Sequence, residues 1–177
     1  MGATSARPKV RLMIVDDHTV IREGLSLMLS AEADLEVIGA ARNGRDAVEI
    51  VTSMKPDVVI MDLNMPVMNG ADAIKRIRGA RPEVDLLVLS SFKDEHEVLR
   101  AIDSGAHVYL FKDGPTEVLE RAIRNIYAGR SSLNPEIAST ELRHLSGTSS
   151  HRHDDDLTSM EVRGSEMAFQ TPGSPRR

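Results

Sequence analysis

Cysteine and tryptophan are absent from this sequence, and aromatic residues make up only 3% of it. Without cysteine, the chain has neither a disulfide framework nor a thiolate metal site. With so few aromatic rings, a hydrophobic core has to be built from valine, isoleucine, leucine and methionine. No apolar run approaches the length needed to span a membrane, and residues 1–8 lack the apolar stretch of a signal peptide. These absences predict a cytoplasmic protein with no membrane partner.

The length and charge of the chain set further limits. Its 177 residues are enough for one domain with a sizeable core and some chain left over. The hydrophobic share of 41% and the charged share of 28% are ordinary for a globular protein. A net charge of −5 gives no reason to expect non-specific binding to nucleic acid or to a membrane surface.

The most informative stretch runs from Pro56 to Gly70. Residues 58–61 are four apolar residues in a row, which predicts a short strand buried on both faces. Asp62 stands where that strand ends, and a loop rich in asparagine, proline and glycine follows. Because ligands bind at the carboxyl ends of parallel strands, we expect Asp62 to be the reactive group of the protein.

Strand and helix patterns alternate along residues 9–130. Apolar runs predict strands at residues 10–15, 35–41, 58–61, 86–89 and 107–111, and each run is followed by apolar residues at helical spacing. The polar start of the second strand suits a sheet edge. Thr19 or Asp17 is expected to cap the first helix, and Gly105 to close the helix at 95–104. This alternation predicts an α/β fold with a five-stranded parallel sheet and helices on both faces.

Right-handed crossovers would bring all the strand ends to one rim of that sheet. Five polar residues stand at or just after these ends: Asp16, Asp17, Asp62, Ser90 and Lys112. Three carboxylates repel each other unless a cation compensates them, and such an oxygen-rich group suits Mg²⁺. With the repulsion reduced, Asp62 could attack a phosphoryl group, Lys112 would balance charge on the transferred oxygens, and Ser90 would donate a hydrogen bond. The rim therefore predicts metal-assisted phosphoryl transfer onto a carboxylate.

These residues resemble a known family. The acidic pair at 16–17, the stretch 61–70, Ser90 and Lys112 are together similar to the receiver domain of bacterial two-component response regulators, over roughly residues 9–130. The resemblance implies a flavodoxin-like (CheY-like) sheet of order 2-1-3-4-5. It also implies that Asp62 is the phosphoacceptor and that Lys112 binds the phosphate. Asp17 and Asp62 would be direct metal ligands, Asp16 a ligand through water, and the carbonyl of Asn64 a further ligand. Ser90 would be the switch hydroxyl and Tyr109 the switch aromatic.

The resemblance further implies a partner and a two-state mechanism. A sensor histidine kinase, or a small acyl-phosphate donor, would phosphorylate Asp62. Ser90 would then move toward the phosphate, Tyr109 would fill the vacated space, and the face formed by residues 94–128 would change shape for an interaction such as homodimer formation. Such a protein is no enzyme beyond its own phosphorylation and dephosphorylation.

Details of the sequence are similar to the NarL/FixJ type of regulator, whose members carry a C-terminal LuxR-type helix-turn-helix domain. These details are Asp-Asp-His at 16–18, Gly105-Ala106, and residues 109–113, where Asp113 replaces the proline of many other receivers. We expect residues 131–156 to form a linker with a short helix at about 135–145. Residues 157–177 resemble only the start of the DNA-binding domain and are expected to be disordered.

Two alternative functions stay open at this point. A Mg²⁺-dependent phosphohydrolase would also form an aspartyl phosphate, but the haloacid dehalogenase type has a second aspartate where this chain has Asn64, which cannot do acid–base work. A complete DNA-binding regulator is disfavoured by the tail: residues 131–177 hold five Arg or Lys and seven Asp or Glu, a net charge of −2. We therefore expect no DNA binding by the chain as written.

Several single residues also allow two interpretations. Ser91 would replace Ser90 as the switch hydroxyl if the strand ran one residue further. Tyr109 could be a packed core residue only. His18 could be a metal ligand, although a solvent-facing residue at a helix start is the favoured interpretation. His151-Arg-His153 is interpreted as part of a flexible polar linker and not as a metal tract.

Overall fold

The computed structural model describes residues 8–91 and 94–130. Strands and helices alternate along them in the order β1 (Val10–Val15), α1 (Thr19–Ser30), β2 (Leu35–Ala41), α2 (Gly44–Met54), β3 (Val58–Met61), α3 (Gly70–Ala80), β4 (Asp85–Ser90), α4 (Glu95–Asp103), β5 (Val108–Phe111) and α5 (Thr116–Tyr127). Every predicted strand is present, with ends that differ by a residue at most. The predictions for residues 131–177, and for residues 1–7, lie outside the described part of the chain.

The strands form one parallel sheet of order β2-β1-β3-β4-β5. This order confirms the predicted flavodoxin-like architecture and the expected edge position of β2. The central strand β3 is buried at all four residues, because it has neighbours on both sides and helices on both faces. Among the residues described, none of the helices is both long and apolar enough to cross a membrane.

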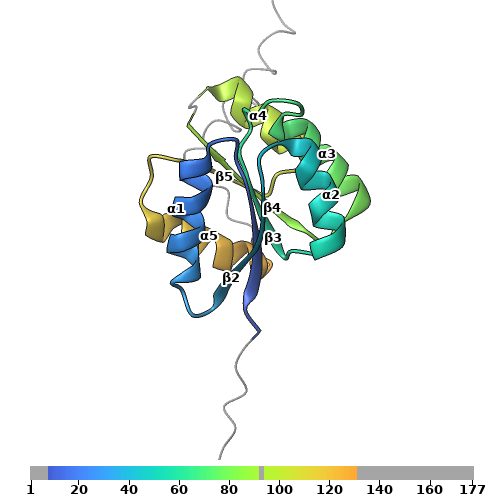
Figure 1. Cartoon of the computed structure of the whole chain (residues 1–177). Coiled ribbons are helices and arrows are strands. Elements are labelled where there is room, and N and C mark those ends of the chain that lie inside the picture. The colour runs from blue at the N-terminus through green and yellow to red at the C-terminus, as the bar shows by residue number, and fades with distance from the viewer. Residues whose placement is uncertain (1–7, 92–93, 131–177) are drawn as a thin grey trace, which may run out of the picture. The chain divides into compact units, whose positions relative to one another are not determined.

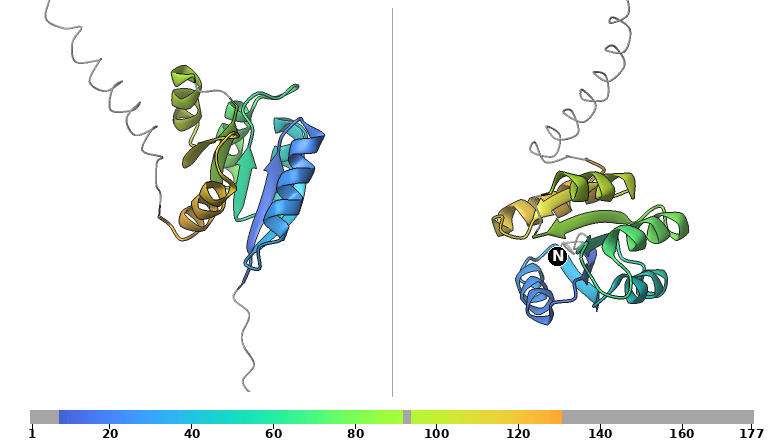
Figure 2. Two further views of the ribbon diagram at one scale, coloured as in Figure 1. Left: turned by 90° about the vertical axis from the view of Figure 1, so that its left-hand side faces the viewer. Right: turned by 90° about the horizontal axis from the view of Figure 1, so that it is seen from above.

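Helices cover both faces of the sheet (Figures 1 and 2). Helices α1 and α5 pack on one face, where the buried residues include Leu29 and Ile123. Helices α2, α3 and α4 pack on the other, where they bury residues such as Val51, Ile74 and Val98. As the composition predicts, both layers are aliphatic, and Tyr109 is the largest side chain that is fully buried.

The amino-terminal ends of the helices differ. Helices α2, α3 and α4 begin after Asn43, Asn69 and Asp94, each of which accepts a hydrogen bond from a backbone N–H in the first turn. Helix α1 begins after His18, whose side chain makes no such bond. The prediction of Thr19 or Asp17 as its cap is therefore wrong, because the acidic residues before α1 turn toward the rim of the sheet instead.

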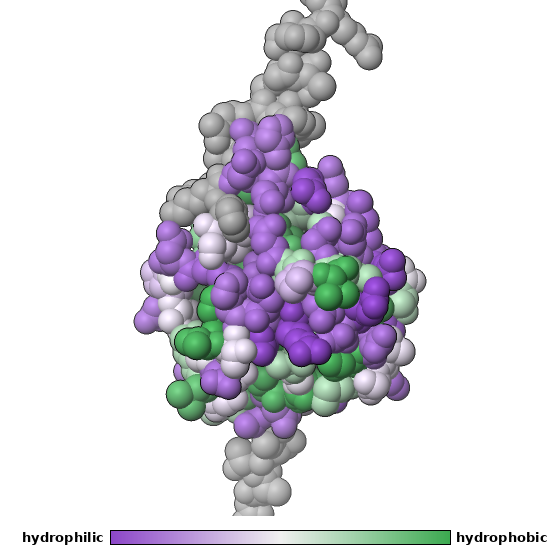
Figure 3. Space-filling view, turned by 45° about the horizontal axis from the view of Figure 1, so that its top comes forward, coloured by the Kyte–Doolittle hydropathy of each residue, from purple (hydrophilic) through white to green (hydrophobic). Residues whose placement is uncertain are grey.

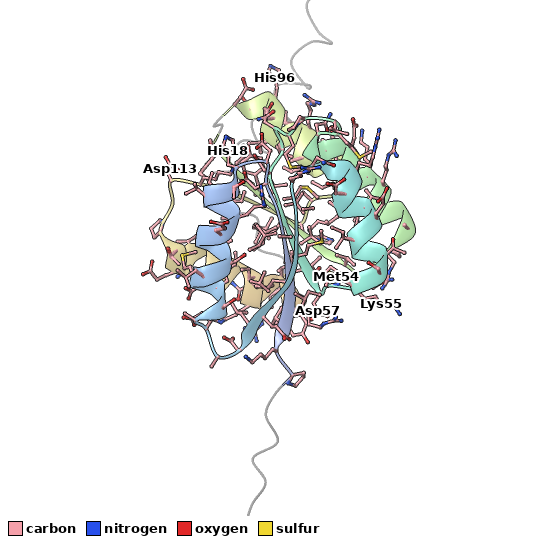
Figure 4. All side chains as sticks on the ribbon, in the orientation of Figure 1. His18, Met54, Lys55, Asp57, His96 and Asp113 are labelled. Atoms are coloured by element: carbon pink, nitrogen blue, oxygen red, sulfur yellow. The ribbon has the colours of Figure 1, made fainter. Side chains whose placement is uncertain are left out.

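The two ends of the sheet are also built differently, as Figure 4 shows. Met54, Lys55 and Asp57 lie at the end away from His18. There the guanidinium of Arg11 donates to the carbonyl oxygens of Met54 and Lys55, and its backbone N–H donates to the Asp57 carboxylate. These bonds satisfy backbone carbonyls at the C-terminus of α2 and hold it against β1, so this end of the sheet has a structural role.

The loop after β3 contains a strained residue. Val67 has a φ of 70°, a left-handed conformation that a β-branched side chain rarely adopts, and its side chain is 69% exposed. We expect Val67→Gly to raise the free energy of unfolding by about 1 kcal/mol, since glycine relieves this strain and no buried contact is lost. Chemical denaturation would measure it. Val20→Gly, at an exposed helical position, should lower stability by a few tenths of a kcal/mol, and a stabilisation by both variants would contradict the explanation.

Candidate functional site

The register of the central strands places two acidic residues side by side. Val15 of β1 pairs with Met61 of β3, and Asp16 and Asp62 are the next residues on these strands. The backbone N–H of Asp62 donates to the carbonyl of Val15 at 2.8 Å. The rim that they share is mostly hydrophilic, with separate apolar spots (Figure 3).

Lys112 links these two carboxylates. It follows Phe111, which pairs with Ser90, so the end of β5 brings its side chain to the same rim. Its Nζ lies 2.5 Å from Asp16 Oδ2 and 3.0 Å from Asp62 Oδ2. Burial alone would lower the Lys112 pKa, but the hydrogen bonds to both carboxylates outweigh it and raise that pKa. The lysine is therefore a fixed cation between two nearly buried acids.

The environment of the rim also changes the pKa of Asp62. Burial raises its pKa above the ordinary value, and Lys112 and the backbone N–H of Asn64 only partly offset that rise. The carboxylate of Asp62 is thus less stable in its charged form than a solvent-exposed one. A divalent cation beside it would restore the charged form, which is the form that attacks an electrophile.

Asp17 completes an arrangement of oxygen atoms that fits Mg²⁺. Its Oδ1 is buried and makes no hydrogen bond within the described residues, although His18 Nδ1 lies 2.9 Å away. Ligand atoms of Asp16, Asp17, His18 and Asp62 all lie within 4.8 Å of one another. Hard carboxylate oxygens at this spacing, one of them unsatisfied, suit a small hard cation.

The position of His18 agrees in part with each of the two interpretations that the sequence allows. Its side chain is 64% exposed, as expected for a helix start, and Figure 4 shows it at the rim. Its Nδ1, however, turns inward and lies 3.2 Å from Asp16 Oδ1 as well as 2.9 Å from Asp17 Oδ1. The ring therefore sits over the acidic pair without being buried by it.

Ser90 and Tyr109 lie next to each other beneath the rim. Ser90 is the last residue of β4 and is fully buried, whereas Ser91 is exposed. Tyr109 is 1% exposed and its ring packs edge-on against Phe111, with centroids 5.6 Å apart. Burial raises the Tyr109 pKa, and a side-chain hydrogen bond with Ser90 partly offsets this. A change at Ser90 would therefore act directly on the tyrosine.

Asn64 connects the loop after β3 to helix α4. Its backbone N–H bonds to the Asp62 carboxylate, and its side-chain Nδ2 donates to Glu97 Oε2 at 3.2 Å. The amide is therefore engaged with α4 and offers no carboxyl group beside Asp62. That arrangement gives no support to a phosphohydrolase with a second catalytic acid at this position.

Two residues at the site had no predicted role. Gly70 approaches the backbone that follows β3 so closely that a Cβ there would lie 2.1 Å from the Asp62 carbonyl oxygen. Arg22 of α1 donates from Nη1 to the carbonyl of Asp16 at 2.7 Å. The glycine had a visible signal, the turn sequence Asn69-Gly70, but nothing in the pattern of α1 distinguishes Arg22 from a solvent-facing arginine.

Comparison with known proteins agrees with this geometry. Residues 12–124 match the family described as the response regulator receiver domain. The chain is 37% identical over 133 residues to the transcriptional regulatory protein LnrK of Bacillus subtilis, which covers 75% of the chain and 60% of LnrK. The chain thus spans less than two thirds of this relative's length.

Solved structures show the same likeness. A two-component response regulator of the LuxR family from Aurantimonas sp. SI85-9A1 superposes with a TM-score of 0.72 at 29% identity, covering 78% of this chain and 99% of that one. The receiver domain of the response regulator NarL from Mycobacterium tuberculosis has a TM-score of 0.67 at 32% identity, covering 70% of this chain and 99% of the other.

Proposed function

This chain belongs to the response regulator receiver family, and from that premise we propose that it accepts a phosphoryl group on Asp62 and switches between two states. The observation that carries the proposal is the contact of Lys112 Nζ with Asp62 Oδ2 at 3.0 Å beside two further acids. A carboxylate oxygen with one ammonium group beside it, and two further carboxylates that could share a divalent cation with it, suits transfer of a phosphoryl group to that oxygen.

Each residue of the rim has a part in the proposed reaction. Asp62 is the nucleophile, held by a backbone hydrogen bond to Val15 of β1 and by the N–H of Asn64. Lys112 already contacts Asp62 and supplies positive charge for the oxygens of the incoming group. Ser90 ends β4, where its carbonyl accepts the backbone N–H of Lys112, and its hydroxyl would donate a hydrogen bond to one of those oxygens.

Asp17 and Asp62 would hold Mg²⁺ directly, Asp16 through water, and the Asn64 carbonyl would complete the protein ligands. Mg²⁺, when bound, supplies charge compensation for the carboxylates and for the phosphoryl oxygens. Asp16 suits an indirect role because both of its carboxylate oxygens already accept hydrogen bonds, from His18 and from Lys112.

The proposed output runs through Ser90 and Tyr109. Movement of Ser90 toward a phosphoryl group would remove the hydrogen bond that it shares with Tyr109, and the ring would adjust against Phe111 and helix α4. The surface of residues 94–128 then changes shape, and this change alters an interaction made by that surface, such as dimerisation. The donor is a sensor histidine kinase or a small acyl phosphate, and we propose no DNA binding by the acidic residues 131–177.

The test is incubation with acetyl phosphate and Mg²⁺, followed by intact-mass measurement and sedimentation. We expect a mass increase of one phosphoryl group that chelation of Mg²⁺ prevents. Hydroxylamine, which cleaves acyl phosphates, should remove the added group. A chain that gains no mass under these conditions, or gains it without a divalent cation, would not act by this mechanism.

Asp17→Asn should weaken Mg²⁺ binding by about 10-fold or more, because it removes the charge of the carboxylate whose oxygen makes no hydrogen bond. The measurement is the rise in Tm with Mg²⁺ concentration, which reports the affinity of the folded state. Asp103→Asn removes the same charge from an exposed position on α4 and serves as the control. Equal Mg²⁺-dependent stabilisation of both variants would exclude Asp17 as a ligand.

A further inference from the structure

Arg22 is placed where the local energetics of helix α1 do not favour it. It lies in the first turn, where the partial positive charge of the helix dipole repels a cation. The other four helices that the structure describes each carry an acidic residue in the first turn, and α1 carries none. A residue that breaks a local rule in this way calls for a reason in the tertiary structure.

That reason is visible in the contacts of its guanidinium. Its Nη1 donates to the backbone carbonyl of Asp16 at 2.7 Å, and its Nη2 donates to Thr19 Oγ1 at 3.1 Å. The Asp16 carbonyl belongs to the first peptide beyond the last paired residue of β1, so no strand neighbour receives it. Asp16 is 2% exposed, so loss of this bond would leave a buried acceptor unsatisfied.

With Arg22 in place, all four hydrogen-bonding groups of Asp16 are engaged. Its N–H donates to the carbonyl of Ala41, its Oδ1 accepts from the N–H of His18, and its Oδ2 accepts from Lys112. Arg22 holds the remaining group, the carbonyl. This carbonyl is part of the peptide that joins Asp16 to Asp17, and the orientation of that peptide sets the direction of the Asp17 side chain.

We propose that Arg22 is a positioning residue of the phosphorylation site, which fixes the Asp16–Asp17 peptide so that the Asp17 carboxylate faces Asp62. The proposal rests on the proposed function, since it assigns a role in cation binding at that site. Arg22 contacts no reacting atom in this role and acts through the backbone of Asp16.

The direction in which Mg²⁺ affinity changes when Arg22 is removed distinguishes three possible roles of this residue. If Arg22 acted only by its charge, its removal would leave the three acids with less positive charge nearby, and Mg²⁺ would bind more tightly. If it positions Asp17, its removal lets the turn relax and Mg²⁺ binds more weakly. A purely structural brace would lower Tm and leave the affinity of the folded protein for Mg²⁺ unchanged.

The experiment is titration calorimetry of the full chain with Mg²⁺, for the wild type, Arg22→Met and Arg22→Lys. We expect the Kd of Arg22→Met to rise about 10-fold to 100-fold, the range typical of residues that orient metal ligands. Arg22→Lys retains the charge and one donor, but cannot serve both Asp16 and Thr19, so we expect a rise of about 3-fold. Arg76→Met, which removes an exposed arginine from α3, should leave the Kd at the wild-type value.

A second readout separates positioning from a direct chemical role. At saturating Mg²⁺, labelling of Arg22→Met by acetyl phosphate should return to within about 3-fold of the wild-type rate, whereas at limiting Mg²⁺ it should be slow. An unchanged or lower Kd in Arg22→Met overturns the proposal. If that variant does not fold, Arg22→Lys decides, and a wild-type Kd there overturns it too. The Arg22 variants do not test the role of Asp62 as the acceptor. Labelling by acetyl phosphate of a chain without Asp62 would overturn the proposed function itself.

Discussion

Replacing Asp62 with asparagine should reduce Mg²⁺-dependent labelling by acetyl phosphate by more than about 1,000-fold, because an amide oxygen is no nucleophile toward phosphorus. The variant should fold, since the asparagine keeps the backbone bond to Val15, and Lys112 retains its contact with Asp16 at 2.5 Å. Intact-mass measurement over a time course gives the rate. Asp103→Asn should label at the wild-type rate, and comparable labelling of Asp62→Asn would show that another residue is the acceptor.

The same variant should be more stable than the wild type at neutral pH. Burial raises the Asp62 pKa in the folded state, so ionisation of Asp62 costs stability at every pH above that raised pKa. Asparagine avoids this cost. As the pH falls below the ordinary aspartate pKa, Asp62 is protonated in both the folded and unfolded states, and the advantage of the variant should shrink. Thermal unfolding at several pH values without divalent cations measures this difference, and a variant less stable than wild type at neutral pH would contradict it.

Gly70→Ala should destabilise the protein by about 3 kcal/mol, at the upper end of the usual cost of overpacking. A Cβ at this position would lie 2.1 Å from the carbonyl oxygen of Asp62 and 2.8 Å from Cα of Leu63. Both are backbone atoms of the segment that carries the Asp62 side chain, so no side-chain rotation can make room. The start of α3 would have to move away from β3, and the labelling rate of the folded fraction should fall with it.

Helix α3 supplies a matched control for this prediction. Gly79 lies in the same helix, and a Cβ there would meet no atom within 4 Å. Gly79→Ala should therefore raise stability by about 0.5 kcal/mol, because alanine loses less backbone entropy in a helix. Denaturant unfolding of both variants gives the comparison. Equal stability of the two would mean that the contact between Gly70 and the backbone of Asp62 and Leu63 relaxes at little cost.

Much of the fold follows from short apolar runs. Residues 58–61 have no polar residue on either face, which only a central parallel strand tolerates, and the mixed polarity of residues 35–41 fits the edge position of β2. Element boundaries were correct to within a residue at β4 and β5. The cap of α1 was predicted wrongly, as Thr19 or Asp17 in place of His18. Asp17 is a good capping residue by propensity, but in the fold its carboxylate lies beside those of Asp16 and Asp62.

Some residues of the candidate site could be predicted from the sequence and others could not. Asp16, Asp62 and Lys112 were predictable because each stands at the end of an apolar run, and strand ends share a rim. Glu97 was not, since its contact with Asn64 spans 33 residues and depends on where α4 packs. His18 was predicted to face solvent, which its exposure supports, but the inward turn of its Nδ1 depends on the two acids beneath it.

By itself, the sequence determined the kind of fold and the kind of chemistry, because hydrophobic periodicity sets which segments are buried and strand ends set where polar groups collect. The tertiary structure decided which atoms meet. Arg22 contacts the carbonyl of Asp16 and Gly70 lies against the backbone of Asp62 only because helices pack on the sheet at particular positions. These contacts join residues that are close in the chain, but their geometry depends on how α1 and α3 pack against the sheet, and no local pattern of residues records that packing.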